Sequence, residues 1–178
     1  MEHLLHIQLV LRQYGSKFVT LGMSETDTTY ERFTLNRIKG IVTPADKLLY
    51  IHSKGITHHG KPTYLSVLSW RIMMEYFLIK CHEQCITDLD TYDAVGIMWH
   101  GTDPIHFNGN VYMHFSGNFW WTTGAYFHQL PNEIGEGYWD PEMWIGKANP
   151  RVKCYYDPPG YNHYRDNVWP ATYITKPL

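Results

Sequence analysis

The sequence has little of several features that mark common protein classes. Its 178 residues contain only three cysteines, an odd number without the spacing of a disulfide framework. Lysine plus arginine (15) nearly balance aspartate plus glutamate (17), and like charges form no long run. This balance argues against nucleic acid or an anionic membrane surface as the main partner. The few cysteines suit a reducing compartment, so we expect a cytoplasmic protein.

Long apolar stretches and several catalytic signatures are also missing. No window approaches the ~18 uninterrupted apolar residues of a membrane span. Residues 1–15 are apolar but interrupted by polar side chains, and they lack the basic segment and the small-residue cleavage site of a signal peptide. The sequence has no G-x-S-x-G elbow, P-loop or G-x-G-x-x-G motif, which weakens hydrolase, NTPase and dehydrogenase interpretations.

Aromatic residues, in contrast, are abundant, at 16% of the chain. The densest group is HFSGNFWW at 114–121, where two adjacent tryptophans follow a Ser-Gly-Asn triplet. Neighbouring side chains diverge in a helix and in a strand, so we expect one tryptophan to pack in the core and the other to face a ligand. Aromatic surface beside small polar residues suits a sugar; the alternative is a wide aromatic core cluster. The candidate binding residues here are Ser116, Gly117, Asn118, Trp120 and Trp121.

Strand and helix patterns alternate along the chain. Apolar and β-branched segments predict strands at 17–23, 46–55, 94–99, 109–116 and 151–156. Periodic patterns with start and stop signals predict helices at 2–14, 28–40, 63–86, 123–130 and 140–146. We therefore expect one domain over residues 1–178, a three-layer α/β/α structure with a mostly parallel, mixed sheet, and an irregular Pro- and aromatic-rich tail at 157–178.

Local patterns refine these elements. Thr28 and Glu31 have the spacing of a capping box, and Asp140 precedes Pro141 as a helix cap. Residues 48–51 are expected to be buried on both faces of the sheet. The long helix is expected to bury Leu65, Leu68, Ile72, Tyr76 and Ile79, with Trp70, Met73 and Phe77 beside them.

The strand end YIHSKG carries the first candidate site. His52, Ser53 and Lys54 stand where a buried strand runs into a loop, the edge at which sheets of this class bind ligands. A cation and an imidazole there could hold a phosphate or a metal-bound diphosphate. The alternative is a polar strand end that faces water.

Three further groups could bind a metal. His100, Asp103 and His106 have an H-x2-D-x2-H spacing, although Gly101 and Pro104 break any helix that would align them. His100 is expected at the same sheet edge as His52. The pair Asp88 and Asp90 resembles a divalent-ion motif but precedes its strand, which favours a solvated turn. Cys81 and Cys85 lie one helical turn apart and are expected to be buried thiols.

Glu142 is the candidate general base. It stands in the first turn of its helix, where the helix dipole favours the ionised carboxylate. Such a group could deprotonate an acceptor hydroxyl, or it could be an ordinary exposed acid.

Five stretches together resemble a known family: KLLYIHSKG, SWRIMMEYF, YDAVGIMW, HFSGNFWWTTGAYFHQLP and DPEMWIG. The sequence is similar to small nucleotide-sugar-dependent glycosyltransferases of bacteria and large DNA viruses with the GT-A fold. In that family a Y-h-H-[ST]-K-G strand end is followed by a helix with Trp-Arg and later by HFSGNFWW. The similarity runs from about residue 46 to 146.

The resemblance implies a hexosyltransferase-like enzyme that moves a sugar from a nucleoside-diphosphate sugar to a glycan hydroxyl. His52, Ser53 and Lys54 would occupy the place of the family's D-x-D metal motif. His114 and residues 116–121 would line the donor-sugar or acceptor pocket, His100 would lie close by, and Glu142 would stand near the reacting hydroxyl.

Two departures from the family limit this reading. The chain begins with a predicted helix instead of the nucleotide-binding strand, so that element is missing, displaced or part of a larger protein. No acidic pair stands at the metal position, and Lys54 could supply the charge instead, which leaves dependence on Mn²⁺ or Mg²⁺ open. A further tension is that a hairpin of 94–99 with 110–115 would put Ser116 at the edge opposite His52. The rival functions are a non-catalytic carbohydrate-binding domain and a metal-dependent hydrolase that uses His100, Asp103 and His106.

Overall fold

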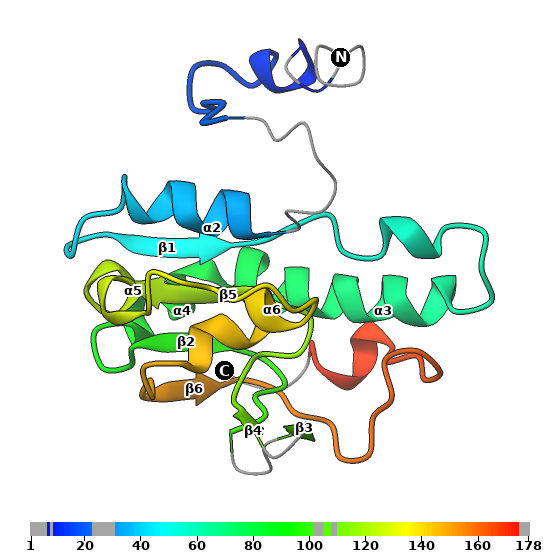
Figure 1. The fold of residues 1–178 in the computed structure, drawn as a ribbon. Helices are drawn as coiled ribbons and strands as arrows, with labels where there is room; N and C mark the ends of the chain where they lie inside the picture. Colours follow the sequence, from blue (N-terminus) through cyan, green and yellow to red (C-terminus); the bar gives the residue numbers. More distant parts are fainter. Residues whose placement is uncertain (1–6, 8, 23–30, 102–104, 108–109, 175–178) are drawn as a thin grey trace.

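The computed structural model describes residues 7, 9–22, 31–101, 105–107 and 110–174 (Figure 1). The helices are α2 (Arg32–Lys39), α3 (Tyr64–Glu75), α4 (His82–Asp88), α5 (Gly124–Gln129) and α6 (Asp140–Met143). Shorter helical turns are Ile56–His58, Trp144–Gly146 and Pro170–Thr172, and a π-helical turn, Tyr76–Lys80, follows α3. The strands are β1 (Lys47–Tyr50), β2 (Ala94–Gly96), β3 (Ile105–Phe107), β4 (Asn110–Tyr112), β5 (Trp120–Thr123) and β6 (Val152–Cys154).

The main sheet has four strands in the order β1-β5-β2-β6. β5 pairs antiparallel with β1 and with β2, while β2 and β6 are parallel. The prediction of a mixed sheet in an α/β domain is confirmed. The expectation of mostly parallel pairing is wrong, because β5, which the sequence reading did not identify as a strand, lies between two strands of the opposite direction.

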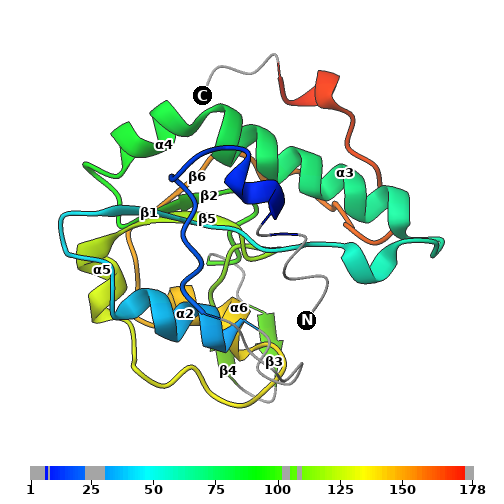
Figure 2. The same ribbon diagram turned by 90° about the horizontal axis from the view of Figure 1, so that it is seen from above.

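Helices lie on both faces of this sheet (Figure 2): α3 and α4 on one side, and α2, α5 and α6 on the other. Each face has its own apolar cluster. The cluster under α3 and α4 includes Trp70, Met74, Phe77, Leu78, Val95 and Phe119. The opposite cluster includes Leu35, Tyr50, Phe115, Trp120, Phe127 and Trp144.

The two adjacent tryptophans belong to different clusters because β5 alternates its side chains between the faces. Trp120 is fully buried and its ring stacks on that of its cross-strand partner Tyr50, with centroids 4.9 Å apart. Trp121 packs on the α3 side, and its indole N–H donates to the carbonyl of Leu78 over 2.7 Å. Neighbouring side chains do diverge, but both tryptophans serve the core.

The long helix predicted at 63–86 is present as α3, the π-helical turn and α4, but its buried face differs. Leu65, Ile72 and Ile79 are 64%, 40% and 41% exposed. Trp70, Met73 and Phe77, expected only beside the buried face, form its centre. Trp70 and Phe77 carry larger apolar surfaces than the aliphatic residues of the predicted face, so their burial contributes more to stability.

The predictions for the N-terminal segment agree less with the structure. No strand forms over residues 17–22, and Val19 there is 74% exposed, since no neighbouring strand pairs with the segment. Within the helix predicted at 2–14, Ile7 and residues 9–12 are helical, and most of the remainder is outside the described residues.

Two predicted helix caps and one predicted burial pattern also differ from the structure. Thr28 is outside the described residues, and the Glu31 side chain does not cap α2. Asp140 is the first helical residue of α6, not its cap, and its carboxylate accepts from the N–H of Gly137 over 2.7 Å. Within 48–51 only Tyr50 is fully buried, because β1 ends there and leaves Ile51 beyond the sheet.

The strands predicted at 94–99 and 151–156 correspond to β2 and β6. The short helix predicted at 123–130 corresponds to α5, and the one predicted at 140–146 corresponds to α6 together with the helical turn that follows it. The segment 109–116 contains β4, which pairs with β3 in a separate two-stranded sheet. The tail described up to residue 174 is mostly irregular, as predicted. None of the described helices has the length and apolar character needed to cross a membrane.

Candidate functional site

The antiparallel direction of β5 decides where the site lies. β1 ends at Tyr50, and the next residues lead to His52 and Lys54. Because Tyr50 pairs with Trp120, the first residue of β5, the segment 116–118 that precedes β5 arrives at the same sheet edge. The expected conflict between Ser116 and His52 is thereby removed, although the sequence alone gave no reason to place a strand at 120–123.

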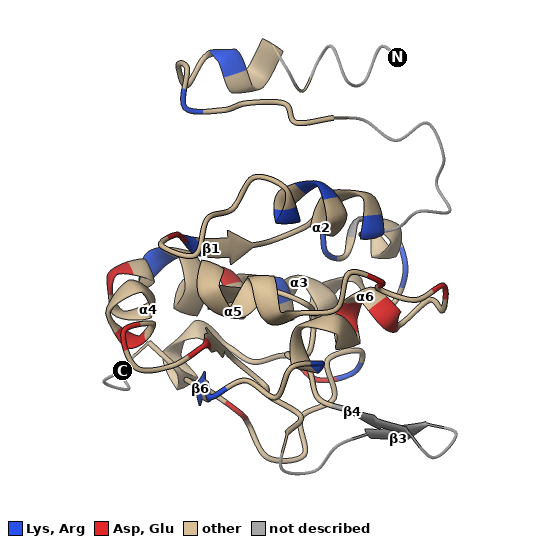
Figure 3. Ribbon diagram, turned by 60° about the vertical axis from the view of Figure 1, so that its left-hand side comes forward, with Lys and Arg blue, Asp and Glu red and all other residues tan. Residues whose placement is uncertain are grey.

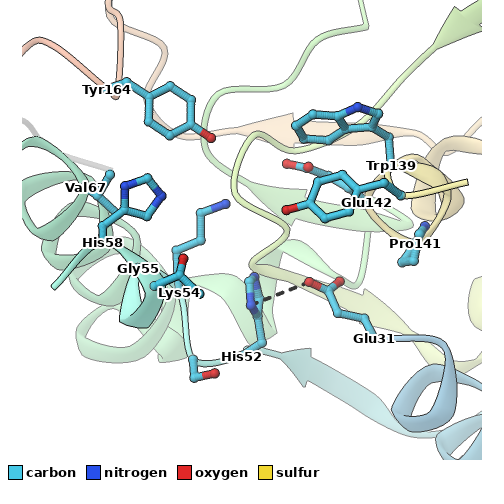
Figure 4. A pocket seen from close by; sticks show the side chains of 13 residues that line it. Glu31, His52, Lys54, Gly55, His58, Val67, Trp139, Pro141, Glu142 and Tyr164 are labelled. Atoms are coloured by element: carbon cyan, nitrogen blue, oxygen red, sulfur yellow. Dashed lines mark ion pairs between the residues drawn. The ribbon is translucent and has the colours of Figure 1, made fainter. Parts of the chain in front are cut away.

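Two adjoining cavities open at this edge. The smaller, of about 320 Å³, is lined by His52, Ser53, Lys54 and His58 among others, and we call it the polar cavity (Figure 4). The larger, of about 630 Å³, is lined by Trp70, His100, His114, Ser116 and His163 among others, and we call it the aromatic cavity. The residues that line both cavities are Lys54, Tyr138, Trp139, Glu142 and Tyr164.

Gly117 joins the residues around the polar cavity through its backbone. Its N–H donates to Oε1 of Glu142 over 2.9 Å, and its carbonyl oxygen is 3.0 Å from Nε2 of His52. Its φ is +90°, a conformation that favours glycine. A Cβ at this position would lie 2.7 Å from Met74 Sδ and 2.7 Å from Trp70 Cζ2. Glycine is therefore needed here for both its conformation and its small size.

Glu31 is the centre of a second set of contacts. One carboxylate oxygen accepts from the Asn118 amide, and the other lies 3.5 Å from Nδ1 of His52. The Asn118 side-chain oxygen in turn accepts from the Trp120 indole N–H over 2.7 Å. Burial and the Glu31 charge raise the pKa of the Tyr50 hydroxyl, which stays neutral.

These contacts change the roles expected for two residues. Both ring nitrogens of His52 face protein oxygens, and the Asn118 side chain is bound at both its oxygen and its nitrogen. His52 lines the polar cavity, but its polar atoms are already engaged. We infer that His52 and Asn118 hold the site in shape, while other groups meet a ligand.

Lys54 is the cation of the site. Its Nζ lies 4.2 Å from the centre of the Trp70 ring, a cation–π arrangement. Burial lowers the pKa of its ammonium, while the carboxylates of Glu142 and Glu31 act in the opposite direction. Figure 4 shows Lys54 and Glu142 pointing into the space between Tyr164 and Trp139. A cation and a carboxylate thus face the region where the two cavities meet.

The chain near its end closes the site from the α3 side. The His163 ring stacks on Trp70, with centroids 4.0 Å apart and planes 23° apart. Burial, together with the nearby Lys54 charge, lowers the pKa of His163 to about 4. Ser69 secures this segment, since its Oγ donates to the carbonyl of Val168 and accepts from the Val168 N–H, each over 2.9 Å.

His100 and His114 meet in the wall of the aromatic cavity. The isolated bridge between Trp99 and Phe115 brings the two segments together, and His100 N–H donates to the carbonyl of His114 over 2.9 Å. Their rings stack with centroids 4.8 Å apart.

The segment before α6 is fixed by contacts from α2. Arg32 donates to the carbonyls of Gly135 and Gly137, and Lys39 donates to that of Leu130. Figure 3 shows basic residues on α2 and acidic residues on α6. These contacts hold the backbone that leads to Tyr138 and Trp139, which line both cavities.

Several predicted residues do not reach the site. Trp120 and Trp121 line neither cavity. Asp88 and Asp90 precede β2 at the opposite sheet edge, where Asp88 accepts from the Tyr155 hydroxyl and Asp90 pairs with Lys47. Burial raises the pKa of the Cys85 thiol to about 11, in line with a buried thiol.

The proposed metal triad is only partly described. Asp103 and the side chain of His106 are outside the described residues, so only His100 can be placed. Among the residues that the structure does describe, no group of three or more histidine, cysteine or acidic side chains could hold a metal ion.

Sequence reasoning missed several lining residues: Glu31, Trp70, Tyr138, Trp139, His163 and Tyr164. Glu31 was interpreted as a helix cap and Trp70 as core. The dense tyrosine and histidine content of YNHYR at 161–165 was a usable signal, because such residues are unusual in a tail that only covers a surface.

The chain was also compared with known proteins. No protein-family model, curated protein or solved structure matches it.

Proposed function

We propose that the protein is a glycosyltransferase that moves a sugar from a nucleoside-diphosphate sugar to a glycan hydroxyl. The observation that carries the proposal is that Lys54 and Glu142 both line the junction of two cavities. Sugar transfer needs a positive group beside the leaving diphosphate and a base beside the attacking hydroxyl. The resemblance of residues 46–146 to GT-A glycosyltransferases supports the same reaction, and we extend the proposal to a GT-A-like domain.

Glu142 acts on the acceptor hydroxyl, and Lys54 acts on the leaving diphosphate. The acceptor hydroxyl gives its proton to Glu142, and its oxygen bonds to the anomeric carbon of the donor sugar. The bond between that carbon and the diphosphate oxygen breaks, and the diphosphate leaves with the bonding electrons. Lys54 stabilises the negative charge that develops on this leaving group. The Gly117 N–H holds one oxygen of Glu142, so the other oxygen is available for the proton.

A divalent ion could share the role of Lys54. Mn²⁺ or Mg²⁺ carried in with the nucleotide would neutralise diphosphate charge, and the carboxylates that line the polar cavity, those of Glu31 and Glu142, are the oxygen ligands it would find there. We propose that Lys54 provides the resident charge and that a metal adds to it.

All three cysteines are free thiols, which supports a cytoplasmic setting.

A non-catalytic carbohydrate-binding domain is the second candidate. The observation in its favour is that Glu31 and Glu142 face the polar cavity beside a single lysine, which gives a diphosphate little net positive charge. A neutral glycan would not meet this difficulty.

A thermal-shift screen with nucleoside diphosphates and nucleotide sugars, with and without Mn²⁺, separates these candidates. A ligand that binds only the native state raises stability by ~2.7 kcal/mol at a hundredfold excess over Kd. We expect stabilisation by one nucleotide, followed by release of that nucleoside diphosphate from its sugar when acceptor glycans are added. Stabilisation by glycans alone, with no response to any nucleotide, would replace the enzyme with the binding domain.

A further inference from the structure

The aromatic cavity contains buried polar atoms that the chain itself does not satisfy. Trp70 is 1% exposed, and its indole nitrogen has no hydrogen-bond partner. Nδ1 of His163, whose ring stacks on Trp70, is also buried without a partner. Both residues line the aromatic cavity. Buried polar groups are nearly always hydrogen-bonded, so these two atoms point to something polar that occupies the cavity.

The cavity also offers a flat apolar surface. Trp139 is 51% exposed although it is a large aromatic residue, and the neighbouring Tyr138 ring packs against it edge-on, with centroids 4.8 Å apart. The contacts of Arg32 and Asp140 fix the backbone on both sides of this pair. An exposed indole ring on a fixed backbone offers a ligand a large apolar contact area, and binding there costs little conformational entropy.

The remaining polar groups of the cavity suit hydroxyls better than phosphates. They include the His100 and His114 imidazoles, the Ser116 hydroxyl and the carboxylates of Asp140 and Glu142, with Lys54 at the junction. This set mixes donors and acceptors, and its acidic groups outnumber its lysine. Hydroxyl groups both donate and accept, so they can pair with such a mixture, whereas an anionic ligand would meet the two carboxylates.

We propose that the aromatic cavity is a binding site for a neutral pyranose, with the C–H face of the sugar against Trp139 and its hydroxyls toward Trp70, His163 and Ser116. The volume of about 630 Å³ lies within the usual range for small-molecule sites. The role of this sugar as the acceptor rests on the proposed function, because Glu142 lines the same cavity and is the base there. Its binding does not rest on that function, since it needs no donor.

The test measures binding of neutral sugars in the absence of nucleotides. The probes are the methyl glycosides of glucose, galactose, mannose and N-acetylglucosamine, together with cellobiose and lactose, followed by saturation-transfer NMR. Uridine and adenosine serve as rival ligands for a stacking cavity. The variants are Trp139→Ala and, as a matched control, Trp169→Ala, because Trp169 is 68% exposed and lines neither cavity.

We expect at least one glycoside to bind the wild type, the Trp139→Ala variant to weaken it by at least tenfold, and the Trp169→Ala variant to leave it unchanged. Ser116→Ala tests the polar side of the cavity in the same way, with an expected weakening of severalfold. Equal affinity in the Trp139→Ala and Trp169→Ala variants, no binding by any probe, or displacement of the glycoside by a nucleoside would overturn the proposal.

Nucleoside-diphosphate binding measured on the same samples separates this inference from the proposed function. If a nucleoside diphosphate binds and no glycoside does, the sugar site is wrong and the transferase remains. If a glycoside binds through Trp139 and no nucleotide does, the sugar site stands and the transferase proposal fails.

Discussion

The backbone N–H of Gly117 donates to Oε1 of Glu142 over 2.9 Å, across 25 residues of chain. This contact fixes the carboxylate from the loop that also meets His52 through its carbonyl group. A glycine that sequence reasoning assigned to ligand contact therefore organises the site: its two polar backbone groups are used within the protein. The position of the acidic group depends on a backbone conformation that other residues rarely adopt.

Replacement of Gly117 by alanine is expected to destabilise the protein strongly. The left-handed conformation costs a non-glycine residue roughly 1–2 kcal/mol. The added Cβ would also approach Met74 and Trp70 to 2.7 Å, and such overpacking costs about 1–3 kcal/mol more. Urea unfolding of the wild type and the variant measures the total loss in the free energy of unfolding.

The matched control for this prediction is Gly160→Ala. Gly160 also has a positive φ, of +67°, but a Cβ there would meet nothing within 4 Å. The control should lose only the conformational part of the free energy of unfolding. Equal losses in the two variants would show that Trp70 and Met74 do not confine Gly117.

Replacement of Glu142 by glutamine should slow transfer strongly and leave the fold intact. The glutamine oxygen can still accept from the Gly117 N–H, but the amide cannot take a proton from a hydroxyl. Loss of a general base reduces the rate by about 10²- to 10⁴-fold. Release of nucleoside diphosphate in the presence of an acceptor measures this rate.

Glu136→Gln is the control for the Glu142 prediction, because Glu136 is exposed in the segment before α6 and lines neither cavity. It should retain the wild-type rate. A Glu142→Gln variant that also keeps that rate would remove Glu142 from the role of base.

Replacement of Lys54 by methionine should weaken nucleoside-diphosphate binding. Methionine keeps the apolar contact with Trp70 but lacks the charge that lies 4.2 Å from the ring. Hydrogen bonds to charged groups contribute about 1.5–3 kcal/mol, which corresponds to a loss of affinity of roughly tenfold to a hundredfold. Titration calorimetry with and without Mn²⁺ measures the change, and Lys61→Met, at an exposed position, is the control. Unchanged affinity in the Lys54→Met variant would place the diphosphate elsewhere.

The sequence predicted which edge of the sheet carries polar residues but not how the sheet brings them together. His52 and Lys54 follow a recognisable strand, and proximity of His100 followed from the strand before it. β5 was missed because its two tryptophans were interpreted as one core residue and one ligand contact. A strand with large side chains on both faces has no alternating pattern, since both faces are buried.

The residues missed at the site share a physical reason. Glu31 precedes α2 and fits a capping pattern locally, but its long-range partners Asn118 and His52 are 87 and 21 positions away and cannot be read from local spacing. Trp70 follows the periodicity of a buried helix face, which it also serves. His163 and Tyr164 lie in an irregular segment whose path is set by contacts such as that between Ser69 and Val168. Tertiary contacts, not local preference, place Glu31, His163 and Tyr164.

The buried His163 ring makes stability depend on pH. Its pKa is about 4 in the folded protein, below the ordinary value of 6.5, because of burial and the Lys54 charge. The Glu142 carboxylate acts in the opposite direction, and His100 and His114 act in the same direction as Lys54. Between these two pKa values the unfolded chain binds more protons than the folded one. Linkage then requires the free energy of unfolding to rise with pH in this window and to fall on acidification from about pH 6.5 toward pH 4.

The His163→Phe variant keeps a ring to stack on Trp70 but has no proton to bind, so its stability should lose less between pH 6.5 and pH 4 than that of the wild type. The difference between the two pH slopes should approach, and not exceed, one proton per molecule. Urea unfolding at a series of pH values gives both slopes, and His59→Phe, at an exposed position against Tyr64, should keep the wild-type slope. If the His163→Phe and wild-type slopes coincide, His163 is not buried against Trp70 in solution, and the segment that closes the aromatic cavity is open.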